Sequence, residues 1–278
     1  MKVHAITTGT VRITLSWQHG HGAYLPRLVR SLTDPRLTDP LPIWCYLIEH
    51  PEGLILIDTG IPANANDPVW FPPFMPLVQR AATFQIEGAE QEIAPQMRAL
   101  GFSPGDVRWV ILTHLHQDHD GGLHHFPNAE FLVACAEWDV AQGISGRMAG
   151  YLNQRWSPDF APTPISYEAS DATFGGRHLV TQAGDVSLVP TPGHSAGHQC
   201  VIVEEGDHVL MFGGDSAYSQ ALLQADALDG VGQSAAAAHE THRCILTFAR
   251  ETPTVFLPSH EWDAARRLET RILLWDNA

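Results

Sequence analysis

Short apolar runs bounded by Gly, Pro or Asp recur along most of the chain. Runs of this length and punctuation are typical of β-strands, because a helix needs a longer amphipathic segment. We expect strands at residues 3–15, 44–50, 54–58, 107–112, 130–134, 178–181, 186–190, 199–204, 209–212 and 254–257. The turn Pro51-Glu52-Gly53 lies between the second and third of these strands and predicts a hairpin.

Longer segments between these strands carry the apolar spacing of helices. We expect helices at residues 91–100, 136–144, 235–250 and 264–274. The first helix is followed by Gly101 and shortly by Pro104, which is a typical stop signal. Strand blocks that are each followed by helices predict an α/β protein in which two sheets pack face to face under helices. We see no second domain, repeat or long linker, so we expect a single domain over residues 1–278.

Two segments rich in Gly and Pro fit no regular element and are expected to be loop insertions, near residues 16–40 and 61–86. Loops this long in a compact domain are usually functional or disordered. The second segment carries Trp70, Phe71 and Phe74, which make it too apolar for a disordered linker. Two interpretations stay open. These rings either cap the core or a partner subunit of a homodimer, or form the wall of an apolar substrate pocket.

Charge and composition limit the classes of partner that the protein is expected to bind. The chain has 16 Lys and Arg against 31 Asp and Glu, a formal net charge of −15, and Lys2 is its only lysine. Such a field repels phosphate backbones and anionic membranes, so we expect a small neutral substrate and no nucleic-acid or membrane partner. No secretory signal or long apolar span is evident. The four cysteines are widely spaced, which predicts free thiols and a cytoplasmic protein.

The polar residues with the clearest chemistry are three histidines and an aspartate packed into six positions: His114, His116, Asp118 and His119. Residues two apart point about 200° apart on a helix, so this run cannot act from one helical face and is expected on a loop after the strand at 107–112. Three further candidates each follow an apolar strand-like run: His194, Asp215 and His260. Imidazole and carboxylate are the ligands that zinc-like divalent metals prefer, so the set predicts a metal site.

Other histidines give weaker signals. His124 and His125 follow the run closely, but we expect that a tandem pair cannot aim both rings at one centre. His198 lies near His194, and a structural role is expected for it.

The arrangement of HxHxDH followed by a lone His, a lone Asp and a lone His resembles the metallo-β-lactamase superfamily. A finer resemblance to the N-acyl-homoserine lactonases of that superfamily rests on these motifs: Leu41-Pro42-Ile43-Trp44, Leu56-Ile57-Asp58-Thr59-Gly60, Thr191-Pro192-Gly193-His194 and Asp215-Ser216-Ala217-Tyr218. The resemblance implies a four-layer αβ/βα sandwich. It also implies a quorum-quenching lactonase that opens the ring of a neutral acyl lactone.

The resemblance assigns a role to each residue and implies two divalent metal ions, expected to be zinc. One metal is held by His114, His116 and His194, the other by Asp118, His119 and His260, and Asp215 bridges them. Tyr218 donates to the developing oxyanion and Asp118 moves a proton. Asp58, at the exit of the strand at 54–58, is our own candidate for orienting a ligand histidine from behind, the alternative being an ordinary turn residue at the strand end. Gln117 occupies a position where some relatives carry an aromatic ring against the acyl chain, so chain-length preference is left open.

Two other classes compete with the lactonase. One is another hydrolase on the same scaffold, such as a glyoxalase-II-like thioesterase, another esterase or a phosphodiesterase, which clustered basic residues would favour. The other is a non-catalytic metal-binding module, which a missing ligand would favour. The chain has few basic residues and all seven expected ligands, so the lactonase is the preferred hypothesis.

Overall fold

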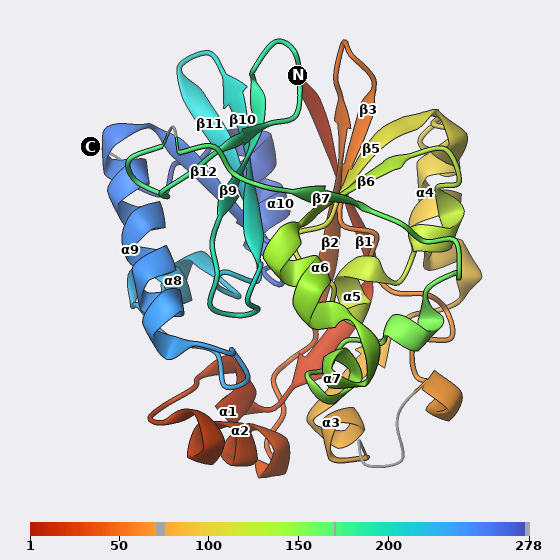
Figure 1. The fold of residues 1–278 in the computed structure, drawn as a ribbon, viewed down its shortest axis with the longest axis vertical. Helices are drawn as coiled ribbons and strands as arrows, with labels where there is room; N and C mark the ends of the chain where they lie inside the picture. The colour runs from red at the N-terminus through yellow and green to blue at the C-terminus, as the bar shows by residue number, and fades with distance from the viewer. Residues whose placement is uncertain (71–75, 170, 276–278) are drawn as a thin grey trace.

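Two β-sheets pack against each other in the computed structural model, which describes residues 1–70, 76–169 and 171–275 (Figure 1). One sheet has seven strands in the order β4-β1-β2-β3-β5-β6-β7, and the other has five in the order β12-β11-β10-β9-β8. The strands of the first sheet are β1 (Lys2–Ile13), β2 (Leu41–Glu49), β3 (Leu54–Ile57), β4 (Ala82–Gln85), β5 (Val107–Ile111), β6 (Glu130–Ala134) and β7 (Thr163–Ile165). Those of the second are β8 (His178–Leu179), β9 (Val186–Pro190), β10 (Gln199–Glu205), β11 (His208–Gly214) and β12 (Thr254–Pro258).

Alternation along the strands divides the apolar side chains between an inner and an outer layer. In β2, Tyr46 and Ile48 point into the space between the sheets, whereas Cys45 and Leu47 point to the outer face. Strand β10 does the same, with Val201 inside. Both faces of each sheet are therefore apolar and must be covered, which explains why these strands read as nearly continuous apolar runs.

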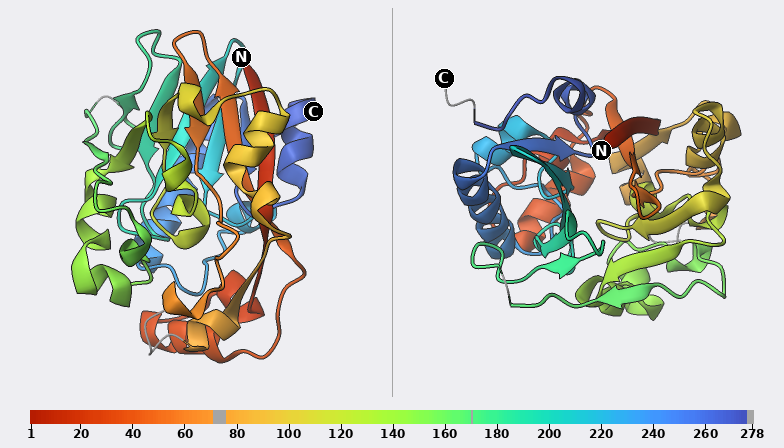
Figure 2. Two further views of the ribbon diagram at one scale, coloured as in Figure 1. Left: turned by 90° about the vertical axis from the view of Figure 1, so that its right-hand side faces the viewer. Right: turned by 90° about the horizontal axis from the view of Figure 1, so that it is seen from above.

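Helices cover both outer faces. Residues of α4 and α6 pack on the first sheet, and residues of α9 pack on the second. Seen from above in Figure 2, the blue helix α9 and the yellow-green helices lie on opposite flanks. The helices are α1 (Leu15–Gln18), α2 (Tyr24–Thr33), α3 (Pro76–Ala81), α4 (Ile93–Ala99), α5 (Gln117–Asp120), α6 (Cys135–Ala141), α7 (Gly143–Met148), α8 (Gln220–Gln224), α9 (Ala235–Glu251) and α10 (Asp263–Thr270). The predicted four-layer α/β sandwich is confirmed.

The prediction that residues 16–40 and 61–86 contain no regular element is wrong. The first segment forms α2, and the second forms α3 and the edge strand β4, which pairs with β1. Pro26 is the third residue of α2, where its missing N–H has no intrahelical partner to lose. Helix α2 also departs from the usual pattern of buried apolar and exposed charged residues. Arg27 is buried and donates to the Gly232 carbonyl, while Leu25 is exposed. The Gly and Pro residues of these two segments thus made the sequence pattern look irregular, although tertiary contacts stabilise helices there.

Two expectations from composition agree with the structure. Cys45, Cys135, Cys200 and Cys244 are all free thiols. Among the described residues, no helix has the length and apolar character needed to cross a membrane.

Candidate metal centre

Five strands deliver polar residues to one edge of the sandwich. Strands β3 and β5 are parallel, and so are β11 and β12; β9 shares the direction of β11 because both are antiparallel to β10. Parallel strands place their carboxyl ends together, which is where open α/β sheets hold their chemistry. The residues that follow these ends are Asp58, the 114–119 run, His194, Asp215 and His260.

The 114–119 run changes conformation halfway. His114 lies in the loop after β5, His116 is the N-cap of α5, and Asp118 and His119 belong to that short helix. The prediction of a loop therefore holds for the first half of the run only. A loop followed by one helical turn lets all four side chains point to the same side, which a regular helix does not allow.

The metal-binding atoms of the seven predicted ligands come close together. Nε2 of His194, His119 and His260 lie 3.5, 3.4 and 3.2 Å from the Asp215 carboxylate. His116 Nδ1 is 3.0 Å from His194 Nε2, and Asp118 lies 3.5 Å from His260 Nε2. Ligand atoms within 4.8 Å of one another form the groups His114–His116–His194, Asp118–His119–His260 and His114–His119–Asp215. The first two coincide with the sets that the resemblance implies, and the assignment itself stays a prediction.

Hydrogen-bond acceptors behind three of the histidine rings fix the orientation and the tautomer of those rings. Nδ1 of His119 lies 2.8 Å from Asp58, Nδ1 of His194 lies 3.1 Å from Asp229, and Nδ1 of His260 lies 2.8 Å from the Pro42 carbonyl. A proton on Nδ1 that is shared with such an acceptor leaves Nε2 as a bare ligand atom. The surroundings therefore direct these Nε2 atoms towards Asp215.

Asp58 connects the loops of two strands. Its backbone adopts a left-handed conformation (φ 57°), which Asp tolerates better than most residues. The carboxylate accepts a hydrogen bond from the Thr113 N–H at 2.8 Å as well as facing His119. A single side chain therefore fixes the start of the 114–119 run and one of its imidazoles.

Buried atoms without partners indicate that cations fit here. Nε2 of His114, Nε2 of His119 and Oδ1 of Asp215 are buried and have no hydrogen-bond partner among the described residues. An unsatisfied buried polar atom is costly, and three such atoms facing one space have the character of a ligand set. The donor set of imidazoles and carboxylates fits divalent zinc-like metals.

Electrostatics agrees with that fit. Burial, together with neighbouring imidazoles, lowers the pKa of His114 and His116, which keeps these rings in the neutral form that binds metal. Burial also lowers the pKa of His194, but the Asp229 and Asp215 carboxylates outweigh it and raise that pKa to about 9. The two carboxylates therefore stabilise positive charge at the ring of His194, whether a bound proton or a bound metal ion provides that charge.

Two buried residues support the site from outside the ligand cluster, and nothing in the sequence distinguishes the first of them. Glu137 of α6 accepts hydrogen bonds from the Leu115 N–H at 3.0 Å and from Ser195 Oγ at 2.7 Å, so it ties together the loops of both halves. His198 accepts from the Asp215 N–H at 3.0 Å, in keeping with the structural role expected for it.

Tyr218 lies beside the metal ligands and receives a hydrogen bond from an unpredicted residue. Its ring centroid is 5.4 Å from that of His260, and Trp17 Nε1–H donates to its hydroxyl oxygen at 2.9 Å. Burial, together with Asp229 and Asp215, raises the pKa of Tyr218 well above its usual range. The phenol therefore keeps its proton at neutral pH, and Trp17 occupies a lone pair so that the O–H is directed elsewhere.

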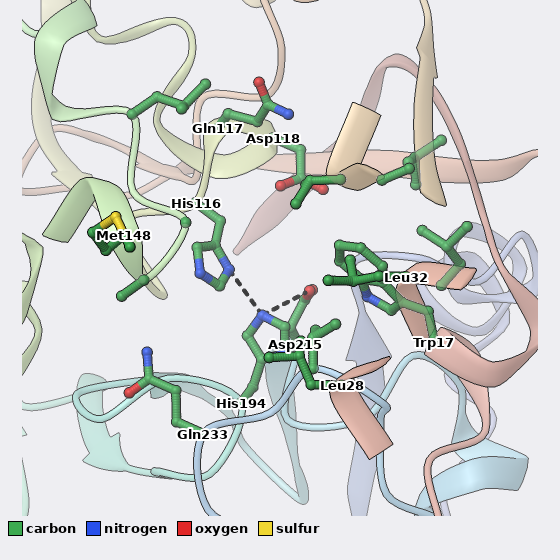
Figure 3. Close-up of a pocket in the computed structure, with 18 of the residues that line it drawn as sticks. Trp17, Leu28, Leu32, His116, Gln117, Asp118, Met148, His194, Asp215 and Gln233 are labelled. Carbon is green, nitrogen blue, oxygen red and sulfur yellow. Dashed lines mark hydrogen bonds and ion pairs between the residues drawn. The ribbon is translucent and has the colours of Figure 1, made fainter. Parts of the chain in front are cut away.

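A cavity of about 780 Å³ opens above these residues. His116, Asp118, His194 and Asp215 face it, and in Figure 3 they lie between Met148 and Gln233 on one side and Trp17, Leu28 and Leu32 on the other. Its apolar wall comes from both halves of the molecule: Val11, Ile13, Trp17, Leu28, Leu32, Val78, Ala82, Phe84, Val140, Met148, Ala149, Leu152 and Val231. Helices α1, α2 and α3, which gather at the lower end of the sheets in Figure 1, thus cover the site.

The predicted pocket residues have different outcomes. Gln117 lines the cavity, and its side-chain oxygen accepts a hydrogen bond from Arg155 at 3.4 Å. Phe71, Phe74 and the side chain of Trp70 lie outside the described residues, so their role stays a prediction. The described part of the same segment contributes Phe84 to the wall.

The expectation that His124 and His125 cannot face one centre is wrong. Both belong to the 3₁₀ turn η4 (Leu123–His125), and their ring centroids are only 3.9 Å apart. Together with Glu92 they present ligand atoms within 4.8 Å of one another. Successive side chains of a 3₁₀ turn project about 120° apart and not to opposite faces as in a strand, so two neighbouring rings can approach each other.

Known proteins resemble this chain over most of its length. A model of the metallo-beta-lactamase superfamily matches residues 38–274. An N-acyl homoserine lactonase of Bacillus cereus is 29% identical over 239 residues, which cover 82% of this chain and 85% of that protein. The structure of an N-acyl homoserine lactone hydrolase with N-hexanoyl-L-homoserine bound at the catalytic metal centre gives a TM-score of 0.76 at 24% identity over 95% of both chains. AidC, a dizinc quorum-quenching lactonase, gives 0.64 at 18% identity over 94% of this chain and 88% of its own.

Proposed function

This chain belongs to the metallo-beta-lactamase superfamily, and from that premise we propose that it is a dinuclear-metal hydrolase that opens the lactone ring of N-acyl-homoserine lactones. The observation that carries the proposal is the position of Tyr218, a protonated phenol beside the seven-ligand cluster at the end of a large apolar cavity. Such a cavity suits an acyl chain, and the phenol suits the carbonyl of the ring.

Each residue has a task in this proposal. Two zinc ions, when bound, polarise a carbonyl and lower the pKa of water, which makes a nucleophile available at neutral pH. Tyr218 keeps its proton and donates a hydrogen bond to the ring carbonyl oxygen as negative charge develops there. Asp118, which lines the cavity beside His260, receives a proton from the attacking water and returns it to the ring oxygen as the ester bond breaks.

The cavity argues against phosphodiester and other anionic substrates. None of the described residues that line it is Lys or Arg, whereas Asp118, Asp139 and Asp215 do line it. A phosphate group would meet carboxylates and no compensating cation except the metals. A neutral acyl lactone has no such penalty, so the phosphodiesterase alternative is less favoured.

Product identity tests the proposal. Incubation of the zinc-loaded protein with N-hexanoyl-homoserine lactone should give one product heavier by one water, which mass spectrometry detects. Acidification should close the ring and restore the substrate, because only the ester bond was broken. Release of free hexanoic acid would instead indicate cleavage of the amide, and an unchanged substrate would contradict the proposal.

The cavity wall predicts a dependence on chain length. Leu28 lines the cavity from α2, so Leu28→Ala should lower kcat/KM for an N-decanoyl lactone about 5- to 30-fold more than for an N-butanoyl lactone. This range corresponds to about 1–2 kcal/mol of lost apolar contact with the distal chain. Leu25 lies on the same helix but is 69% exposed and outside the cavity lining, so Leu25→Ala is the matched control. An equal loss for both substrates would show that Leu28 only stabilises the fold.

Several finer features stay predictions from the sequence. These are zinc as the native metal, a homodimeric assembly, a cytoplasmic location and contact of Trp70, Phe71 or Phe74 with the acyl chain. The description of AidC as a dizinc lactonase supports zinc for this chain.

A further inference from the structure

A second cluster of metal-binding side chains lies where three loops meet, apart from the seven ligands described above. Glu92 precedes α4, while His124 and His125 belong to η4, directly after the 114–119 run and the Gly121-Gly122 turn. The Glu92 carboxylate also accepts a hydrogen bond from the Ala63 N–H at 2.7 Å, which brings in the loop after β3. The cluster therefore joins segments that are distant in sequence.

The atoms of this cluster are arranged like an open ligand set. Nε2 of His125 is 2.6 Å from Glu92 Oε2, and Nε2 of His124 is 4.0 Å from the same oxygen. All three ligand atoms lie within 4.8 Å of one another. Ligands of a tetrahedral zinc ion, with bonds of about 2.0–2.1 Å, stand roughly 3.3 Å apart. The observed spacings bracket that value, so small side-chain rotations suffice to reach it.

Exposure differs among the three ligands in a way that suits ion entry. The Glu92 and His125 side chains are 12% and 17% exposed and held by the fold, whereas that of His124 is 60% exposed. Two positioned ligands and one adjustable ligand leave the fourth position open to water. We propose that Glu92, His124 and His125 form an additional site for a zinc-class divalent cation, distinct from the dinuclear centre.

A cation at this site would link the loops that support the dinuclear centre. The Gly122 N–H donates to Thr59 Oγ1 at 3.0 Å, and the Gly121 N–H donates to the Gly60 carbonyl at 2.9 Å. These bonds already connect η4 to the loop that contains Asp58. A cation that joins η4 to Glu92 would also join η4 to Ala63, whose N–H donates to Glu92. The same group of loops would then be linked on its outer side as well. The expected effect is therefore a gain in stability, with no part in the reaction.

Metal stoichiometry tests the site without reference to hydrolysis. Protein that already holds its two metals is dialysed against increasing zinc, and bound metal is measured directly. Wild-type protein should take up a third equivalent, and its Tm should rise as it does so. His124→Ala should bind that equivalent about tenfold more weakly or worse, because loss of a ligand costs at least as much as loss of a supporting contact. Because the His124 side chain is 60% exposed, its removal should leave the fold intact.

Two more variants make the result specific. Glu92→Gln keeps the shape of the side chain but removes its charge, and it should also lose the third equivalent. His4 forms a similar pair with Glu49 at 2.7 Å and is 15% exposed, but has no second histidine in its pair, so His4→Gln should retain the third equivalent. Two equivalents in the wild type, or a third one that persists in His124→Ala, would overturn the proposal.

Discussion

Replacing Asp215 with Ala should lower bound metal from two equivalents per chain and reduce turnover by more than about 100-fold. Loss of a supporting contact alone typically costs 10- to 100-fold in metal affinity or activity. Asp215 is more central than such a contact, since its carboxylate lies within 3.5 Å of Nε2 atoms from both predicted ligand sets. Without it, two neighbouring dications would lose the anion that offsets their repulsion. Metal analysis and turnover, measured on the same sample, check both expectations.

An exposed carboxylate provides the control for this variant. Asp207 lies on the turn between β10 and β11 with its side chain 96% exposed, so Asp207→Ala should keep full metal content and rate. An Asp215→Ala protein that keeps two equivalents and full turnover would contradict the bridging role. One retained equivalent with little activity would support it.

The second large effect is expected for Tyr218→Phe, which should keep both metals and lower kcat by about 10- to 10³-fold. This is the range expected when a donor to a developing oxyanion is removed. Tyr218 is not one of the seven predicted ligands, so metal content should not change. Some loss of stability is also expected, since Trp17 Nε1–H loses its acceptor and a partly buried donor without a partner costs about 1–3 kcal/mol. Wild-type kcat would rule out the oxyanion role, and loss of metal would make Tyr218 structural.

Trp17→Phe separates the orientation of the phenol from its presence. This change removes the indole donor but keeps Tyr218 and an aromatic wall. The expected loss in kcat is about 2- to 13-fold, the rate equivalent of one neutral hydrogen bond. It should therefore be smaller than the loss in Tyr218→Phe. A larger loss would mean that Trp17 contacts the substrate itself.

The metal cluster could be predicted from sequence because its information is local. Each ligand follows directly on an apolar strand, so the strand pattern and the polar residue are read together. His114, His116, Asp118 and His119 needed only their spacing. The four layers were predictable for a similar reason, since continuous apolar runs such as 200–203 require cover on both faces.

The supporting residues could not be predicted because they act over long distances in sequence. Asp229 contacts His194 from 35 residues away, and Trp17 contacts Tyr218 from 201 residues away. Neither the residue type nor the spacing in the sequence distinguishes Asp229 and Trp17 from other residues of the chain. His124 and His125 were misjudged for a different reason: their convergence depends on a 3₁₀ turn that the apolar pattern does not reveal.

Some residues of the cavity wall were predicted from the sequence and others were not. Aromatic residues of the 61–86 segment were predicted as candidates, and Phe84 of that segment does line the cavity. Leu28 and Leu32 of α2 were not, because Gly22 and Pro26 obscured the helix that carries them. A segment rich in Gly and Pro is thus a weak guide where long-range packing stabilises a helix.

Acid release from N-hexanoyl- and N-decanoyl-homoserine lactone, followed in a pH-stat before and after chelation, tests the central claim most directly. The metal-loaded protein should release one equivalent of acid per lactone, lose that activity when a chelator removes the metals, and regain it when zinc is restored. A thioester and a phosphodiester, assayed in parallel, should react far more slowly. Lactone hydrolysis that persists in fully metal-free protein, or faster hydrolysis of the thioester or the phosphodiester, would contradict the assignment as a metal-dependent lactonase.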